Sequence, residues 1–408
     1  MVLRFLYSIF IQSYSFLIFI ASFFNKKAKL LINGRRATFN RINAFRELTH
    51  DQAITWMHCA SLGEYEQGRY LIERLKKLYP DKKIVVSFYS PSGFEFLSKH
   101  PVDFVDFIFY LPSDTASNTK KLLTKLNPSL FILVKYEFWL NMLSALRGAN
   151  IPGILISSQF KRDHFIFSFW GRNHYQELSH FQKIFTINEE DKKVLLEHGI
   201  QQVQVAGDTR IESSLANLTA DIYFDKVHEY AEKFEKVVVY GSIWKDDLPA
   251  IEETIKEKKN YLHIIAPHKT DLATTSYLQS RFPENNLWAD TYTHNLLIVN
   301  TIGPLKHLYR YADLVYIGGG FHKGLHNTLE AAVWEKPLIF GPDYQNFKEA
   351  VDFIKKEVAI SVNNQDEFRN ALTRLITKDP DVFSKSYQSY FSEQKDSTEL
   401  IIDYIREL

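Results

Sequence analysis

The sequence predicts an α/β protein with two doubly wound parallel sheets, each flanked by helices. From residue 53 onward, short apolar runs alternate with helical patterns, as expected for parallel strands joined by crossover helices. A polar stretch at residues 212–235 interrupts this alternation, which restarts at residue 237. With 408 residues, the chain is long enough for two or three domains. We therefore place the boundary between two domains within the polar stretch.

The first sheet is predicted from apolar runs between residues 53 and 206. Helical patterns separate them, such as Glu64–Leu78 and Asp191–His198, and the latter ends in a His-Gly stop signal. The predicted strands are Ala53–Cys59, Lys83–Tyr89, Phe107–Leu111, Ser129–Lys135, Gly153–Ser157, Lys183–Ile187 and Gln202–Ala206.

The second sheet is predicted from a second series of runs: Val237–Ser242, Leu262–Ala266, Leu296–Asn300, Leu314–Ile317, Pro337–Phe340 and Val358–Val362. Residues 379–408 show helical patterns without a strand signal, and we expect them to pack back across the first domain. The predicted organisation is an anchor at 1–25, an N-terminal Rossmann-like domain at 26–215, a C-terminal one at 216–378, and final helices. Because such sheets bind ligands at the carboxyl ends of their strands, the cleft between the domains is the predicted active site.

The N-terminus is predicted to hold the protein at a membrane. Residues 5–24 form an apolar run of twenty, about the length of one spanning helix. Basic residues flank it, and the first acidic residue is Glu47, so by the positive-inside rule the rest of the chain faces the cytoplasm. A secretory signal would need a shorter apolar core and a small-residue cleavage site. A helix lying in the interface is the alternative. The flanking basic residues are Arg4, Lys26, Lys27, Lys29, Arg35, Arg36, Arg41 and Arg46.

The composition and the absence of certain motifs exclude several kinds of ligand and reaction. The net charge of +1 gives no electrostatic case for binding nucleic acid. A single cysteine, Cys59, excludes an internal disulfide and a cysteine-based zinc site and indicates a cytosolic location for the chemistry. The sequence contains no HExxH motif, no Cys/His cluster and no GxSxG elbow. We therefore expect neither a required metal nor serine hydrolase chemistry.

A glycine-rich segment, residues 318–330, is the clearest functional signal. Glycines let the backbone approach a ligand, and the helix predicted to follow would present free N–H groups, so a phosphorylated ligand is expected. The spacing fits neither the P-loop nor the GxGxxG fingerprint. Asn327 and Glu330 would share a helix face, suited to ribose hydroxyls; the alternative is a glycine-rich turn with an Asn cap. The residues predicted to bind the ligand here are Gly319, Gly320, Lys323, Asn327, Thr328 and Glu330.

Glu64 stands where the first strand feeds its helix and is the candidate general base. Ser61-x-x-Glu64 also fits a capping box, which spacing alone favours. Gly63 lies in the same turn, and Ser90 and Ser92 form a similar small-residue turn after the second strand.

Four further strand ends carry polar residues. Lys135 and Glu137 follow the fourth strand, either as an ion pair or with the acid facing the cleft. Arg210 can reach a phosphate or pair with Asp208. In the second domain, strand ends supply a small hydrogen-bond donor, an indole and an imidazole. The histidine is either a ligand-binding residue or a structural one. These are Ser242, Trp244 and His268.

Ten motifs in order resemble the 3-deoxy-D-manno-octulosonic acid (Kdo) transferases, across residues 1–350. They are His58-Cys-Ala-Ser-Leu-Gly-Glu64-Tyr-Glu-Gln67-Gly68, Ser90-Pro-Ser-Gly93, Leu111-Pro-Ser-Asp114-Thr, Asn127-Pro, Lys135-Tyr-Glu137-Phe-Trp139, Gly207-Asp-Thr-Arg210, Gly241-Ser-Ile-Trp244, Pro267-His268, Gly318-Gly-Gly320 and His326-Asn-Thr-Leu-Glu330-Ala-Ala.

The resemblance implies a GT-B glycosyltransferase that moves Kdo from CMP-Kdo to a lipid A precursor on the cytoplasmic face of the bacterial inner membrane. It implies that Glu64 is the catalytic base, that Glu137 is a second functional glutamate, and that Asn327 and Glu330 hold the CMP portion. The turns at Ser242 and His268 would complete the donor pocket. A single donor phosphate would need no metal, because backbone N–H groups and cations can stabilise it.

Two alternatives keep the predicted fold. One is another nucleotide-sugar enzyme, either a UDP-sugar transferase or an epimerase. The other is a membrane-tethered sensor of nucleotide sugars, for which replacement of Glu64 would leave function intact.

Overall fold

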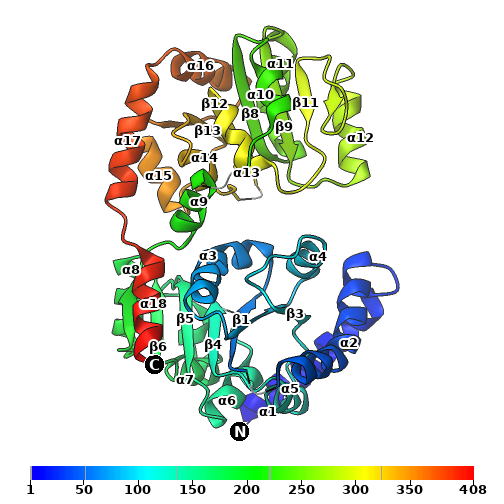
Figure 1. Ribbon diagram of the computed structural model, residues 1–408. Helices are drawn as coiled ribbons and strands as arrows, with labels where there is room; N and C mark the ends of the chain where they lie inside the picture. The colour runs from blue at the N-terminus through cyan, green and yellow to red at the C-terminus, as the bar shows by residue number, and fades with distance from the viewer. Residues whose placement is uncertain (1, 51, 136, 220–221, 323) are drawn as a thin grey trace. The chain divides into compact units, whose positions relative to one another are not determined.

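The computed structural model describes residues 2–50, 52–135, 137–219, 222–322 and 324–408. The chain divides into two compact units, each described here by itself (Figure 1). Unit 1 comprises Met1–Ser213 with Lys395–Leu408, and unit 2 comprises Ser214–Gln394. Each unit contains a parallel sheet with helices around it, which confirms the predicted α/β fold with two doubly wound sheets.

Unit 1 is built on a seven-stranded parallel sheet of order β3-β2-β1-β4-β5-β6-β7. Trp56 in the central strand stands opposite Val85 on one side and Phe131 on the other. The strands are β1 Ile54–Cys59, β2 Lys83–Phe88, β3 Phe107–Tyr110, β4 Leu130–Val134, β5 Gly153–Ser158, β6 Lys183–Thr186 and β7 Val203–Val205. All seven coincide with predicted runs to within two residues at either end.

Alternate residues of these strands enter two hydrophobic cores, one on each face of the sheet, as the two-residue period of a strand requires. Trp56 belongs to the core beneath α5 and α6, and its neighbour Met57 to the core beneath α3 and α4. The helical elements of unit 1 are α1 Val2–Ala21, α2 Lys26–Thr49, α3 Leu62–Leu78, α4 Pro91–Lys99, α5 Ala116–Leu126, α6 Leu140–Gly148, the short η1 Phe165–Phe167, α7 Arg172–Leu178, α8 Glu189–Glu197, α9 Arg210–Thr219, which runs on into unit 2, and α18 Ser397–Glu407.

Unit 2 repeats the architecture with the strand order β10-β11-β9-β8-β12-β13-β14, all parallel. Its strands are β8 Lys236–Ile243, β9 Tyr261–Pro267, β10 Asn286–Leu287, β11 Leu296–Ile298, β12 Leu314–Ile317, β13 Leu338–Phe340 and β14 Ala359–Ser361. Its helical elements are α10 Asp225–Ala231, η2 Lys245–Asp247, α11 Leu248–Glu257, α12 Leu272–Arg281, α13 Leu305–Leu308, η3 Tyr309–Tyr311, α14 Leu329–Ala332, α15 Lys348–Lys355, α16 Gln365–Ile376 and α17 Pro380–Ser392.

The last two helices belong to different units. In α17, Tyr387 packs edge-on against Phe353 of α15, and its hydroxyl donates to the carbonyl of Lys336, so this helix is part of unit 2. Helix α18 buries Ile401 and Ile402 in the core beneath α3. The prediction had grouped residues 379–408 together, whereas the structure separates them between Gln394 and Lys395.

In each sheet, the direction of winding reverses beside the first strand. In unit 1, β1 lies between β2 and β4, and the chain winds outward from these two strands in opposite directions. In unit 2, β8 lies between β9 and β12 in the same way. Ligands of such sheets bind outside the carboxyl ends of the strands at this reversal. The loops after β1, β4, β8 and β12 are therefore the positions at which to look for function.

Candidate active site

The predicted residues of unit 1 lie at the loops that follow β1, β2 and β4. Glu64 is in the first turn of α3, and its Oε2 accepts a short hydrogen bond from the backbone N–H of Ala60. Burial raises the pKa of the Glu64 carboxyl, the Ala60 hydrogen bond lowers it, and the charge of Glu137 raises it again, for a net rise above 4.5. A carboxylate whose pKa is raised is a better proton acceptor than an ordinary surface carboxylate.

The capping box predicted for Ser61 and Glu64 is not formed. Ser61 is the N-cap residue of α3, but its side chain makes no capping hydrogen bond. The Glu64 carboxylate accepts from Ala60 and not from the N-cap backbone at Ser61, as a capping box would require. The spacing fits the motif, but the Glu64 carboxylate binds the N–H of the residue before the N-cap.

A buried polar group links Glu137 to the centre of the sheet. The Ser87 hydroxyl accepts from Trp56 Nε1 at 2.8 Å and lies 2.8 Å from His58 Nδ1. If the Ser87 hydroxyl donates its proton to His58 Nδ1, Nδ1 is the acceptor and the neutral imidazole carries its hydrogen on Nε2. That Nε2 lies 3.5 Å from Glu137 Oε2. The same carboxylate oxygen accepts from Trp139 Nε1 at 3.0 Å. Glu137 is thus oriented by the hydrogen bond from Trp139 and lies close to the His58 ring.

The small-residue turns after β1 and β2 meet one another. The hydroxyls of Ser90 and Ser92 are 2.8 Å apart, and Ser92 Oγ is 3.5 Å from the backbone nitrogen of Leu62 at the start of α3. Gly63, next in that helix, is exposed, and a Cβ there would lie 3.9 Å from Ser61 Oγ, an ordinary contact. The predicted residues Ser61, Gly63, Ser90 and Ser92 therefore belong to adjoining loops.

Arg210 pairs with Asp208, the second of its two predicted partners. Its Nε lies 3.0 Å from both carboxylate oxygens of Asp208, and its Nη2 lies 2.5 Å from one of them. Burial raises the pKa of Asp208, but the charge and hydrogen bonds of Arg210 outweigh it and hold the pKa below its ordinary value. Lys135 has a left-handed backbone with φ of 64°, and its charge lowers the pKa values of both Glu64 and Asp208.

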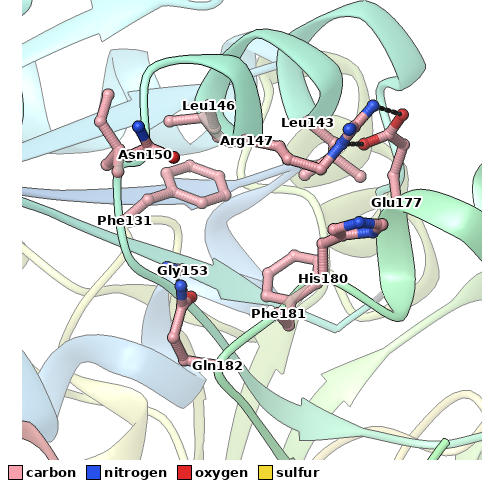
Figure 2. A pocket seen from close by; sticks show the side chains of 11 residues that line it. Phe131, Leu143, Leu146, Arg147, Asn150, Gly153, Glu177, His180, Phe181 and Gln182 are labelled. Atoms are coloured by element: carbon pink, nitrogen blue, oxygen red, sulfur yellow. Dashed lines mark hydrogen bonds and ion pairs between the residues drawn. The ribbon is translucent and has the colours of Figure 1, made fainter.

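A pocket of about 240 Å³ in unit 1 lies at the other edge of the sheet (Figure 2). Phe131 and Gly153, at the amino ends of β4 and β5, form part of its wall, and the Arg147–Glu177 ion pair spans one side. The predicted residues follow the carboxyl ends of the strands, so they do not line this pocket.

In unit 2, the glycine-rich loop after β12 is fastened to the turn after β8. Asp247 is fully buried and accepts from the backbone N–H groups of Trp244, at 2.7 Å, and Gly319, at 3.1 Å, and from the Tyr316 hydroxyl at 2.9 Å. Gly319 has φ of 91°, a conformation that favours glycine. At Gly320 a Cβ would come within 2.7 Å of the Gly341 backbone. These glycines are required by the fold of the loop itself.

Three aromatic rings stack beside this loop. The His268 ring centroid lies 4.4 Å from that of Trp244 and 4.4 Å from that of His326. Trp244 Nε1 donates to His326 Nε2 at 2.9 Å, so His326 is neutral and carries its proton on Nδ1. Burial and the neighbouring His268 lower the pKa of His326 to about 4, in agreement with that assignment. His268 is thus part of a ring stack and not an isolated core histidine.

A cavity of about 240 Å³ adjoins the stack, and residues of the β8 and β9 loops, η2, α11 and α12 line it: Ile243, Trp244, Lys245, Asp246, Leu248, Pro267, Lys269, Thr274, Tyr277 and Leu278. Lys269 Nζ lies 5.3 Å from the Trp244 ring centroid, and Lys245 Nζ lies 4.1 Å from that of Tyr277. Ser242, which precedes the lining residue Ile243, has φ of 56° at a bulge in β8. Aromatic faces next to ammonium groups suit a flat, negatively charged ligand.

The segment after the glycines differs from the prediction. The helix it opens, α14, has only four residues, so the segment lacks a long helix dipole. Asn327 Nδ2 donates to Glu330 Oε1 at 3.2 Å, and Asn327 Oδ1 accepts from Leu329 N–H. The two side chains therefore meet, as their spacing predicted. Thr328 is fully buried and is not placed to contact a ligand, and Lys323 lies outside the described residues.

Two residues that organise these sites, Asp247 and His58, have no role among the predicted site residues. Asp247 is buried and holds two loops together, and the signal was its position three residues after Trp244, as in a capping box. His58 was quoted within a motif without a role, although it lies against Glu137. Among the described residues, no group of three or more His, Cys, Asp or Glu side chains is arranged to hold a metal ion.

The matching family model and the similar proteins that follow indicate the same family. Residues 34–213 match the family model of 3-deoxy-D-manno-octulosonic-acid transferase (kdotransferase). A 3-deoxy-D-manno-octulosonic acid transferase of Rickettsia felis is 25% identical over 376 residues, 88% of this chain and 79% of that protein. The Aquifex aeolicus transferase is 26% identical over 337 residues, 81% of this chain and 88% of that protein. A bifunctional glycosyltransferase/methyltransferase of Fusobacterium nucleatum is 26% identical, and the chain spans 56% of its length.

Solved structures show the same fold. The UDP-GlcNAc 2-epimerase from Neisseria meningitidis has a TM-score of 0.64 at 16% identity and covers 88% of this chain and 100% of its own. A Listeria monocytogenes protein, a putative UDP-N-acetylglucosamine 2-epimerase, has a TM-score of 0.61 at 12% identity, with 87% and 96% covered. At these identities the likeness concerns the fold alone, and it agrees with the expected GT-B architecture. The resemblance to the Kdo transferases is therefore confirmed, by the family model over residues 34–213 and by relatives along most of the chain.

Proposed function

We propose that this protein is an inverting glycosyltransferase that moves Kdo from CMP-Kdo to a lipid A precursor, lipid IVA, in lipopolysaccharide biosynthesis at the cytoplasmic face of the inner membrane. The observation that carries the proposal is the placement of the matching residues. Glu64 and Glu137 lie at the winding reversal of unit 1, and the glycine-rich loop and the ring stack lie at that of unit 2. Relatives that are 25–26% identical along most of this chain are Kdo transferases.

In the proposed reaction, the Glu64 carboxylate takes the proton of an acceptor hydroxyl. The hydroxyl oxygen forms a bond to the anomeric carbon of Kdo, and the bond from that carbon to the phosphate oxygen breaks with its electron pair. CMP leaves as the anion, and the sugar configuration inverts. The raised pKa of Glu64 supports this role, because the base must hold the proton once it has been taken.

Glu137 is assigned a positioning role in unit 1. Its carboxylate is fixed by Trp139 and faces His58, and its negative charge raises the pKa of Glu64. Removing this charge would lower the basicity of Glu64 without removing the base itself. Lys135 has the opposite effect on Glu64, so the two charged residues after β4 adjust in opposite directions a pKa that burial raises most.

In unit 2, we assign the nucleotide to the cavity and loop around Trp244. The aromatic and ammonium groups of the cavity suit the base and phosphate of CMP. The paired Asn327 and Glu330 side chains suit the ribose hydroxyls, because a carboxylate accepts both hydroxyl hydrogens and the amide steadies it. With one donor phosphate, we expect the reaction to need no metal.

The experiment is to incubate the protein with CMP-Kdo and tetraacylated lipid A precursor, measuring CMP release and the product mass. Parallel reactions with UDP-GlcNAc, with and without the lipid, test the second candidate function, which the epimerase fold favours. A Kdo-sized mass increase with stoichiometric CMP supports the proposal. Turnover of UDP-GlcNAc alone, without turnover of CMP-Kdo, would replace it.

A further inference from the structure

Helix α1 is fastened to unit 1 by polar side chains. Arg4 donates to Ser144 Oγ at 3.1 Å and to Glu177 Oε1 at 2.6 Å. The Tyr7 hydroxyl donates to Asp114 Oδ2 at 2.6 Å, and Ser15 and Tyr14 bond the hydroxyls of Ser113 and Tyr89. Arg4, Tyr7, Ile11, Tyr14 and Ser15 recur every three or four residues, so they form one helix face, and Ile11 on it is buried.

The partners of this face are themselves buried. The side chain of Glu177 is 1% exposed and also accepts from Arg147, as Figure 2 shows. Asp114 is 3% exposed and caps α6 through the backbone N–H groups of Asn141 and Met142. If α1 left unit 1 to cross a bilayer, both carboxylates would lose a charged or hydroxyl partner in a low-dielectric setting, which is unfavourable.

The opposite face of α1 is apolar and exposed. Residues 3–21 are long and apolar enough to cross a membrane by length and composition, but the row of residues around Ile11 is docked on unit 1 and leaves the other side of the helix free. The exposed large side chains are Phe5, Leu6, Ile9, Phe10, Phe16, Leu17, Phe19 and Ile20, with Tyr14 partly exposed at the border of the docked face, followed by Phe23 and Phe24 in the turn before α2. An apolar surface of this extent on a folded protein marks a contact with a partner or a membrane.

A second segment, far away in sequence, extends this surface. The loop around η1 exposes Phe169 and Trp170 at 70% each and Phe165 at 52%. The ring of His174 connects it to α1, because it lies 5.6 Å edge-on from Tyr7 and 5.2 Å from Phe165. Two segments of unit 1 that meet through His174 therefore both expose large aromatic side chains. Trp is enriched at the level of lipid head groups, where its ring is apolar and its N–H is wet.

We propose that α1 does not cross the membrane but remains docked on unit 1 and lies in the plane of an anionic lipid surface. In this arrangement the exposed apolar face of α1 and the aromatic loop 165–170 enter the same leaflet together. The charge of the adjoining segment identifies the occupant, because Lys26, Lys27, Lys29 and Arg36 are exposed and no acidic residue precedes Glu47. Interfacial helices bind in this way, with the apolar face among the lipids and basic residues at the head groups.

The arrangement also connects the lipid surface to the candidate acceptor residues. Tyr89, which bonds Tyr14 of α1, stacks on Trp139 at 4.8 Å, and Trp139 holds Glu137. A docked α1 would therefore keep the loops after β2 and β4 at the membrane surface. The inference deepens the membrane location proposed above, and vesicle binding is measured without donor or acceptor, so its failure is distinguishable from a failure of turnover.

The first test measures the depth of α1. Single-cysteine variants Phe5→Cys, Phe10→Cys, Phe16→Cys and Ile20→Cys of the full chain are labelled with an environment-sensitive fluorophore; native Cys59 is fully buried and should not react. On vesicles of phosphatidylethanolamine and phosphatidylglycerol, brominated lipids report the depth of each label. A docked helix gives one shallow depth for all four positions. A depth that increases from both ends toward Phe10 would establish a spanning helix and overturn the proposal.

The second test addresses the aromatic loop. The double variant Phe169→Ser/Trp170→Ser should lower the vesicle partition coefficient of the full chain by roughly tenfold or more, because two large side chains no longer enter the lipid. The matched control is Leu272→Ser, at an 82% exposed position in unit 2, which should bind like the unmodified protein. Unchanged binding by the loop variant, with an unchanged melting temperature, would overturn the role of the loop.

Discussion

The replacement Glu64→Gln removes the proposed base but keeps its size and an oxygen that can accept the Ala60 hydrogen bond. General-base catalysis contributes about 10²- to 10⁴-fold in rate. Since each tenfold factor corresponds to about 1.36 kcal/mol of activation free energy, we expect the barrier to rise by about 2.7–5.4 kcal/mol and kcat to fall accordingly. The affinity for CMP-Kdo should stay within about twofold, because the proposed donor residues belong to unit 2.

The assay is CMP release at saturating CMP-Kdo and lipid acceptor, with donor affinity measured separately by calorimetry. The matched control is Glu66→Gln in the same helix, because the Glu66 carboxylate is 36% exposed and pairs with Arg69 at 3.3 Å. This control should keep the kcat of the unmodified enzyme. A Glu64→Gln enzyme that retains kcat within about threefold would refute the assignment, since no general base could contribute so little.

The pH dependence provides a second readout of the same prediction. Only the ionised Glu64 can accept a proton, and burial raises its pKa above the ordinary 4.5. The kcat of the unmodified enzyme should therefore fall as the pH is lowered through that raised value. The residual activity of Glu64→Gln should lack this acid limb. If the limb persists in the variant, another group is the base.

Four further predictions concern the rest of the molecule. Asp247→Asn turns an acceptor into a donor facing backbone N–H groups, so unit 2 should lose about 1–3 kcal/mol of unfolding free energy by chemical denaturation and bind CMP more weakly; unchanged values for both would contradict the role of Asp247 as a fastening. Glu330→Ala should weaken CMP binding by roughly tenfold, or about 1.4 kcal/mol, in calorimetry, and an unaltered Kd would remove Glu330 from the donor site. Burial raises the pKa of Glu212 to about 7, so the stability that this group contributes is present at low pH and is lost as the pH rises from 4.5 through 7. At about 1.36 kcal/mol per pH unit, the stability lost over this range amounts to about 3 kcal/mol. Because Glu212 accepts from Ser397 N–H, the loss should appear as faster amide hydrogen exchange at the start of α18. Glu212→Gln should flatten this pH dependence, and an equally steep dependence in the variant would disprove the role of Glu212. Finally, EDTA should leave turnover within about twofold, whereas a loss restored by Mg²⁺ would contradict metal-independent transfer.

The strands were predictable because each is a short apolar run between polar turns. Buried parallel strands need apolar side chains on both faces, so each appears in the sequence as a run of consecutive apolar residues. Strand β10, Asn286–Leu287, is the exception, since two residues cannot form a recognisable run. The order of the strands was not accessible, because it depends on pairings between segments that can be more than seventy residues apart, such as β8 and β12.

The site was predictable where a contact is local and was missed where it is not. Asn327 and Glu330 meet as their spacing predicts. The capping box at Ser61 and Glu64 failed because the Glu64 carboxylate reaches the neighbouring N–H of Ala60, a choice made by the exact path of the turn. Asp247 was missed because it accepts hydrogen bonds from Gly319 and Tyr316, which are about seventy residues further along the chain.

The amino-acid sequence alone was sufficient for the fold class, for the strand ends that carry Glu64, Glu137 and the glycine-rich loop, and for the resemblance to the Kdo transferases. These properties depend on residue types at short spacings, where sequence and geometry are directly linked. Tertiary structure decided which partner Arg210 takes, how Asp247 joins two loops, and that α1 exposes only one side of its apolar run. Such outcomes depend on side chains from distant segments competing for the same hydrogen-bonding groups and the same buried surface, and that competition is settled only when the chain is folded.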